Sequence, residues 1–180
     1  MMTSVSIVRE KEVGTMEVLL ASPVRPVKII FAKMIPYFAI SCVALVTILF
    51  LARYLLEVPM SGGIGGIFSL SLLYLMLSFS LGLLVSTIAS TQMAALLISA
   101  MVMMMPILML SGMLFPIENL PKFFKVVSNI VPARWYIDAV RKMMIQGLPL
   151  VAVWKNYVIL LGMTVAILGV SLKKFNDKLE

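Results

Sequence analysis

The chain of 180 residues is 62% hydrophobic and only 13% charged, and its mean hydropathy is +1.08. Soluble domains are about half apolar and about a quarter charged, so this composition excludes an ordinary soluble domain and indicates an integral membrane protein. A helical span needs about 20 apolar residues, and four spans would therefore use roughly half of the sequence.

The sequence contains no histidine and a single cysteine, Cys42, which lies within an apolar run. The chain therefore lacks the commonest general base, proton switch and metal ligand, and it can form neither an intrachain disulfide nor a thiolate cluster. We predict no metal site and no cofactor. The net charge of +7 comes from lysines and arginines at the margins of apolar runs, where such residues anchor membrane helices, so nucleic acid is not an expected partner.

The N-terminal region has two parts, an uncharged stretch at residues 1–8 and a charged, amphipathic stretch that begins at Arg9. Residues 1–8 do not have the pattern of a signal peptide, and we interpret them as the end of a preceding span. Residues 9–26 mix charged residues with apolar residues at helical spacing. Gly14-Thr15 predicts a break and a new helix N-cap, and prolines close the stretch, so we expect a short amphipathic surface helix at about residues 15–21.

Four long apolar runs are predicted to span the membrane, at residues 29–51, 67–88, 93–114 and 153–172. Pro106 lies inside the third run, and because a proline removes a helical hydrogen bond, we expect a kink near Met103. Lysines and arginines divide eight to seven between the two sides that four spans define. The positive-inside rule therefore does not orient this chain.

Two of these spans carry further patterns. In the second, Ser78, Gly82 and Ser86 are spaced by four, so they lie on one helical face and suit close helix packing. The third span is rich in methionine, whose flexible thioethers either fill gaps between helices or line a route for varied apolar substrates. These methionines are Met101, Met103, Met104, Met105, Met109 and Met113.

Residues 116–147 form the most structured polar region. Between Pro121 and Pro132, apolar residues recur on one helical face, which predicts an amphipathic helix of about three turns that lies in the interface or dips in and out of the membrane. A second limb is expected at about residues 134–146. The predicted fold is thus an all-α membrane protein with about four transmembrane helices, an N-terminal amphipathic helix and a re-entrant or interfacial helix pair before the last span.

Three stretches carry a resemblance to a known family. They are Arg9-Glu10-Lys11-Glu12-Val13-Gly14-Thr15-Met16-Glu17 with Leu19-Leu20-Ala21-Ser22-Pro23, then Leu110-Ser111-Gly112-Met113-Leu114-Phe115-Pro116, and Pro132-Ala133-Arg134-Trp135-Tyr136 through Arg141 to Gly147. Together they resemble the integral membrane subunits of ABC-2 type exporters, and the resemblance covers nearly the whole chain.

The resemblance implies two sites. The first, residues 9–26, is a cytoplasmic coupling segment that contacts the ATP-binding subunit. Its expected residues are Arg9, Glu10, Lys11, Glu12, Gly14, Thr15, Glu17, Leu20, Ser22 and Pro23. The second, residues 116–147, is an extracytoplasmic re-entrant helix pair that acts as an outer gate. Its expected residues are Pro116, Phe123, Phe124, Pro132, Arg134, Trp135, Tyr136, Arg141 and Gly147.

The resemblance also implies partners. The sequence has no Gly-x-x-x-x-Gly-Lys-Ser/Thr motif, so ATP hydrolysis is expected on a separate ATP-binding subunit, and a second permease subunit should complete the transporter in a prokaryotic cell membrane. Permeases of this family usually carry two further spans near the N-terminus, so we interpret the chain as the C-terminal part of one. The expected cargo is drug-like or lipid-like.

Two functions are alternatives to a transport subunit. An intramembrane hydrolase could use Ser111-Gly112 as a nucleophile turn, but no histidine is present to activate the serine, and Asp138 and Asp177 lie in separate segments. The other alternative is a truncated membrane protein that does not transport, or that only binds a partner.

Overall fold

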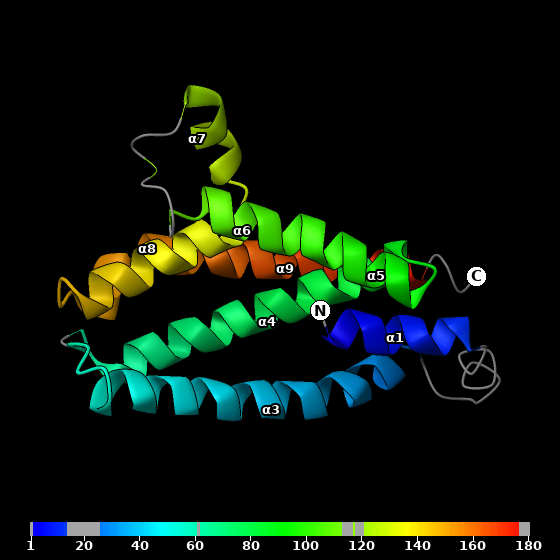
Figure 1. Ribbon diagram of the computed structural model, residues 1–180, viewed down its shortest axis with the longest axis horizontal. Coiled ribbons are helices and arrows are strands. Elements are labelled where there is room, and N and C mark those ends of the chain that lie inside the picture. The colour runs from blue at the N-terminus through cyan, green and yellow to red at the C-terminus, as the bar shows by residue number, and fades with distance from the viewer. Residues whose placement is uncertain (1, 14–25, 61, 113–116, 118–120, 177–180) are drawn as a thin grey trace.

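The computed structural model describes residues 2–13, 26–60, 62–112, 117 and 121–176, and its regular secondary structure in these residues is entirely helical (Figure 1). The elements in chain order are α1 (Met2–Glu12), α3 (Pro26–Tyr54), α4 (Ile64–Ile88), α5 (Gln92–Ser99), the π-helical turn η1 (Ala100–Met104), α6 (Met105–Leu110), α7 (Lys122–Ser128), α8 (Pro132–Met144), the 3-10 turn η3 (Leu150–Val153) and α9 (Trp154–Asn176).

Four helical segments of the described chain are long and apolar enough to cross a membrane. They are Met34–Tyr54, Ile64–Ile88, Gln92–Leu110 and Leu150–Lys174. The predicted class, an all-α membrane protein with four spans, is therefore confirmed. The helix of the first span is longer than the predicted span, because α3 begins at Pro26 and continues through Pro36 to Tyr54. Proline suits the start of a helix because its φ is fixed near the helical value.

The third span is not a uniform α-helix. The π-helical turn η1 separates α5 from α6, and it ends two residues before Pro106. In a regular helix the ring of Pro106 would meet the carbonyl of Val102, which lies inside η1, and the wider turn relieves that conflict. The sequence predicted a kink near Met103, and the structure has the π turn there.

Thr91 caps the start of α5, because its Oγ1 accepts a hydrogen bond of 3.2 Å from the Ala94 N–H.

Helix α4 is the centre of the bundle. It packs along α9 and also contacts α1, α3, α5 and α8. Its side chains Leu70 and Leu77 are fully buried in the core, together with Leu160 of α9. The Ser171 hydroxyl of α9 donates a hydrogen bond of 3.2 Å to the Ser80 carbonyl of α4, which requires close approach of the two helices.

The small-residue row lies on this central helix. Gly82 and Ser86 are buried and Ser78 is partly buried. Their burial is compatible with close helix packing, and their role in association between helices stays a prediction. The Ser86 hydroxyl donates to the Leu83 carbonyl of its own helix at 2.7 Å.

Candidate functional site

The described bundle has two ends. At one end, called the α8 end, lie the turn from α3 to α4, the C-terminus of α8 and the start of α9 (Figure 1). At the other, called the α1 end, lie the C-terminus of α1, the turn from α4 to α5 and the C-terminus of α9. Helix α8 ends at the α8 end and carries the predicted outer-gate residues Pro132, Arg134, Trp135, Tyr136 and Arg141. The described part of the predicted coupling segment includes the C-terminus of α1, at the α1 end.

Helix α7 is shorter than the three turns that the sequence predicted. It spans seven residues and ends at Ser128. Arg134 of α8 explains the early end, because its Nη1 donates to the carbonyl of Lys125 at 3.1 Å, to the Asn129 Oδ1 at 2.7 Å and to the Ser128 hydroxyl. The Lys125 carbonyl would serve Asn129 N–H in a longer helix. Instead the Lys125 carbonyl accepts a hydrogen bond from Arg134, six residues beyond the end of the helix, and hydrophobic periodicity does not predict such a contact.

The corner between α7 and α8 is fixed by further contacts. The indole Nε1 of Trp135 donates to the Asn129 carbonyl at 3.0 Å, and the Arg134 guanidinium lies 5.6 Å from the Trp135 ring centre. Pro132 is the first residue of α8, where a missing N–H is harmless. Figure 1 shows α7 projecting away from the bundle, whereas α8 lies beside α9.

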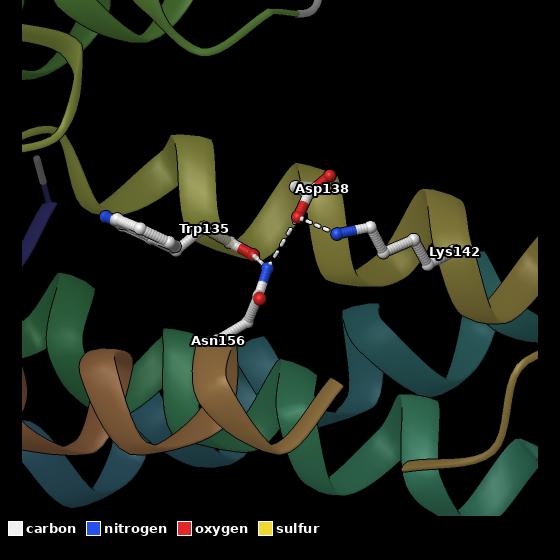
Figure 2. A network of polar contacts seen from close by, with 4 residues as sticks. All are labelled: Trp135, Asp138, Lys142 and Asn156. Atoms are coloured by element: carbon white, nitrogen blue, oxygen red, sulfur yellow. Dashed lines mark hydrogen bonds and ion pairs between the residues drawn. The ribbon is translucent and has the colours of Figure 1, made fainter. Parts of the chain in front are cut away.

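A polar network joins α8 to the start of α9 (Figure 2). The side-chain amide of Asn156 donates to the Asp138 carboxylate at 2.8 Å and to the Trp135 carbonyl at 3.0 Å, and Lys142 forms an ion pair of 2.7 Å with the same carboxylate. Burial alone would raise the pKa of Asp138. The hydrogen bonds from Lys142 and Asn156, with the charges of Lys142 and Arg134, together outweigh the effect of burial, so the pKa of Asp138 lies below its usual value.

A second set of contacts joins α8 to α4. The rings of Tyr136 and Tyr74 stack with centroids 4.3 Å apart, and the Tyr136 hydroxyl lies 3.0 Å from the Ser71 hydroxyl. These contacts, with the hydrogen bond from Asn156 to the Trp135 carbonyl, join two of the predicted gate residues to neighbouring spans, Tyr136 to the central helix and Trp135 to the last span. The sequence did not predict Ser71 or Asn156 as partners.

The C-terminal half of α8 is tied to two turns. Arg141 Nη2 donates to the Gly112 carbonyl at 3.2 Å, and Gly112 has a φ of 80°, which favours glycine. The Gly62 N–H donates to the Met143 carbonyl at 3.1 Å. A Cβ on Gly62 would collide with the backbone of Met143 and Leu148, so only glycine allows this approach. Gly147, with a φ of 66°, forms the turn after α8.

The two remaining predicted gate positions with described side chains are Phe123 and Phe124. Their rings meet edge to face with centroids 5.6 Å apart, and both are exposed on α7. Pro116 lies outside the described residues. On the third span, Met101, Met105 and Met109 line a cavity of about 320 Å³, which leaves both interpretations of the methionines open.

At the α1 end, the C-terminus of α1 is bonded to the N-terminus of α5. Glu12 accepts hydrogen bonds from the Gln92 backbone N–H at 3.1 Å and from the Gln92 side-chain amide at 2.9 Å, and these bonds lower the pKa of Glu12. A carboxylate suits this place, because the first N–H groups of a helix have no internal partner and carry partial positive charge. The Ser4 and Ser99 hydroxyls, 3.2 Å apart, join the same two helices.

Helix α1 crosses the boundary that the sequence suggested between residues 8 and 9. It runs without interruption from Met2 to Glu12, so Arg9, Glu10, Lys11 and Glu12 belong to one helix with the preceding apolar residues. Of these, Arg9 and Glu12 are exposed. The expected surface helix at residues 15–21 lies outside the described residues, as do Gly14, Thr15, Glu17, Leu20, Ser22 and Pro23.

Comparison with known proteins gives the family. The family model of the ABC-2 family transporter proteins matches residues 1–173. The chain is 31% identical over 180 residues to the "Probable multidrug ABC transporter permease YbhS" of Escherichia coli, covering 99% of this chain and 48% of the relative. It is 30% identical over 178 residues to "ABC transporter G family member 20" of Dictyostelium discoideum, covering 98% of this chain and 24% of that relative.

A third relative, the "Inner membrane transport permease YhhJ" of Escherichia coli, is 27% identical over 179 residues, covering 97% of this chain and 46% of the relative. No solved structure matches the chain. The chain spans about half the length of the bacterial relatives, or less. The family match covers nearly all of the sequence, including three of the candidate spans in full and the fourth except for its last residue. The chain is therefore a multi-pass membrane protein that belongs to the ABC-2 family of transporter proteins.

Proposed function

We propose that this chain forms part of the permease of an ATP-driven exporter, which works with a separate ATP-binding subunit and a second permease subunit. The observation that carries the proposal is the family match over residues 1–173, which includes the four candidate spans except for the last residue of the fourth. Two Escherichia coli relatives have names that describe them as probable multidrug transporter permeases. Those names support a drug-like cargo for this chain, and a lipid-like cargo would use the same apolar route.

The coupling site is proposed at the α1 end. Residues 9–26 follow or belong to α1, whose last residue Glu12 is bonded to the first N–H of α5. A force that an ATP-binding subunit applies to this segment would reach the third span through Glu12–Gln92 and Ser4–Ser99. Rigid-body motion of a helix across a subunit interface is a common way to transmit such a change.

The outer gate is proposed at the α8 end. Helix α8 is bonded to α4 through Tyr136, to α9 through Asp138 and to the end of α6 through Arg141. It therefore contacts three of the candidate spans, and a small shift of those spans would move it. In this arrangement both termini face the cytoplasm, and residues 115–153 face the outside or enter the membrane from outside. A cysteine at Lys122 should therefore react with an impermeant thiol reagent from the outside.

The test is transport by the complete permease that contains this segment, reconstituted in liposomes with its ATP-binding subunit. We expect Glu17→Gln to reduce cargo-stimulated ATPase activity and ATP-dependent transport while the protein stays in the membrane, and Glu12→Gln to weaken the link to α5. The control is Glu57→Gln, an exposed carboxylate in the turn between α3 and α4, at the opposite end of the bundle. Normal stimulation in both coupling variants at equal expression would contradict the coupling site. Absence of ATP-dependent transport in the unaltered complex would contradict the function itself.

A further inference from the structure

A cavity of about 370 Å³ lies where the α7–α8 corner meets the bundle. The corner contributes Val127, Ile130 and Ala133 to its walls, the π turn contributes Met103, and α9 contributes Ile167. Among the described residues that line the cavity, Tyr74 alone has a polar side chain, and its ring is stacked on Tyr136. The walls therefore offer many methyl and methylene contacts and almost no hydrogen-bond partners.

Such a cavity does not suit water. A buried water needs two to four polar partners, and an apolar cavity without them stays dry but accepts apolar molecules. Three of its walls are candidate spans, namely α4, the third span and α9, so the cavity lies at a depth where the surrounding solvent is lipid hydrocarbon. An engineered apolar cavity of about 150 Å³ holds benzene, and by that measure about 370 Å³ has room for roughly a dozen carbon atoms.

A positive charge lies beside this cavity. Arg134 follows the lining residue Ala133 in α8, and its Nη1 donates to the Lys125 carbonyl, the Ser128 hydroxyl and the Asn129 amide oxygen. All three acceptors are neutral, so these bonds orient the guanidinium without cancelling its charge. Asp138, one turn further along α8, is bonded to Lys142 and Asn156, and it interacts with Arg134 through charge. An oriented guanidinium is well suited to bind a phosphate.

We infer that the cavity binds one acyl chain of an anionic membrane phospholipid, whose phosphate lies at Arg134. This lipid is a resident component rather than the exported cargo, so the inference goes beyond the proposed function and does not depend on it. Its binding comes from close packing and from the charge, because lipid tails are already in an apolar solvent and gain little by transfer. By filling the cavity, the chain holds the α7–α8 corner against α4 and α9.

The test uses the protein in phosphatidylethanolamine vesicles that contain phosphatidylglycerol with a photoreactive diazirine at the end of one acyl chain. Illumination followed by peptide mapping should label segments that line the cavity, in α6, the α7–α8 corner and α9. Excess unlabelled phosphatidylglycerol should compete, and phosphatidylcholine should compete less well. Arg134→Gln should reduce this headgroup preference while labelling of the same segments continues.

Two variants fill the cavity from opposite walls, Ile167→Phe on α9 and Ala133→Leu on α8. We expect each to lower labelling of the lining peptides about ten-fold, which corresponds to about 1.4 kcal/mol. Val165→Phe is the matched control, because it adds the same ring to the same helix at a side chain that is 64% exposed. The thermal midpoint of each variant is measured beside its labelling.

Three results would overturn the inference. The first is unchanged labelling of the lining peptides in both filled variants with unchanged thermal midpoints. The second is an absence of competition by phosphatidylglycerol in the unaltered protein, a readout that needs no variant to fold. The third is loss of the bound probe during ATP turnover with the partner subunit, which would make the lipid a cargo. Failure of transport by the complex would contradict the proposed function and leave the labelling result intact.

Discussion

Helices α3 and α4 are adjacent spans with similar composition and very different surroundings. The span segment of α3 has a mean hydropathy of 2.4, and 6% of its most apolar stretch is buried in the protein. The span segment of α4 has a mean hydropathy of 2.1, and 44% of its most apolar stretch is buried. Hydropathy therefore measures how well a segment suits the bilayer, and it does not say whether lipid or protein surrounds it. In a membrane both environments are apolar, and no transfer energy separates them.

The difference lies in small and hydroxyl-bearing residues. The buried face of α4 includes Ser71, Ser80 and Gly82, small residues that allow neighbouring backbones to approach. The Ser71 hydroxyl meets the Tyr136 hydroxyl of α8, and the backbone carbonyl of Ser80 accepts a hydrogen bond from Ser171 of α9. On α3, large side chains such as Val43, Ile48 and Phe50 are exposed, and the Thr47 hydroxyl donates to the Val43 carbonyl of its own helix. This contrast predicts that equal substitutions in the two helices have unequal costs.

The largest effect is expected from the core of α4. Leu77 is fully buried, and Leu77→Ala should lower the free energy of unfolding by about 2 kcal/mol, the lower limit for such cavities, since lipid removes most of the transfer contribution. Ile48→Ala on α3, where the side chain is 62% exposed, should change it by less than about 0.5 kcal/mol. Unfolding in mixed micelles by a denaturing detergent measures both. Equal losses would mean that α3 has a protein partner at this face.

The next effect concerns Asn156, which is 6% exposed and donates to both Trp135 and Asp138. Asn156→Ala should cost about 1–2 kcal/mol, because it removes two hydrogen bonds and leaves a carbonyl and a carboxylate with fewer donors. Thr47→Ala on α3 is the control, because the Thr47 hydroxyl donates to a carbonyl of its own helix. The same unfolding measurement applies, and a proteolysis rate at the α7–α8 corner should rise only in the Asn156 variant. No change in either quantity would show that the network does not hold α8.

A smaller effect is expected at the contact between α8 and α4. Tyr136→Phe removes the hydroxyl that meets Ser71 and keeps the ring stacked on Tyr74, so the loss should be close to the average for hydrogen bonds between membrane helices, about 0.6 kcal/mol. Ser71→Ala should give a similar loss, and the double variant should cost no more than either single one. Additive losses would mean that the two hydroxyls act separately.

The smallest effect is a dependence on pH. Because the pKa of Asp138 is lowered in the folded protein, its stabilising contribution is present above the usual pKa of about 3.9 and is lost as pH falls through the lower folded value. Stability should therefore begin to fall below about pH 5 and continue to fall as the pH drops through the folded pKa, by a modest amount since solvent reaches the carboxylate. In Asp138→Asn this fall should be reduced. An identical pH profile in the variant would assign the titration to another group.

The sequence predicted the class of fold because span length and hydropathy are properties of single segments. It placed all four spans, and it put the disturbance of the third span where η1 occurs, because Pro106 acts on its own helix. It did not predict the short α7 or the uninterrupted α1. Helix α7 ends early because Arg134 reaches back to Lys125, and such a contact depends on the path of the chain between them.

For the candidate sites, the family resemblance predicted individual residues, and the structure shows which side chains they contact. Arg134, Tyr136 and Arg141 were predicted, whereas Ser71, Gln92 and Asn156 were not, since polar residues in apolar segments give no sign of which helix they will meet. One signal was available for Gln92. It follows Thr91, a good N-cap residue, and the start of a helix is a place where a carboxylate such as Glu12 is favoured.

The contact at Gly62 limits how α8 can move relative to the turn between α3 and α4. Its N–H bonds to the carbonyl of Met143, and the two backbones meet with no side chain between them, so the turn that follows α3 has little freedom to slide over the end of α8. Any swing of α8 away from the bundle must then either break this backbone bond or carry the turn along. In the second case, α8 would move together with the C-terminal end of α3 and the N-terminal end of α4, and the backbone contact at Gly62 would stay intact.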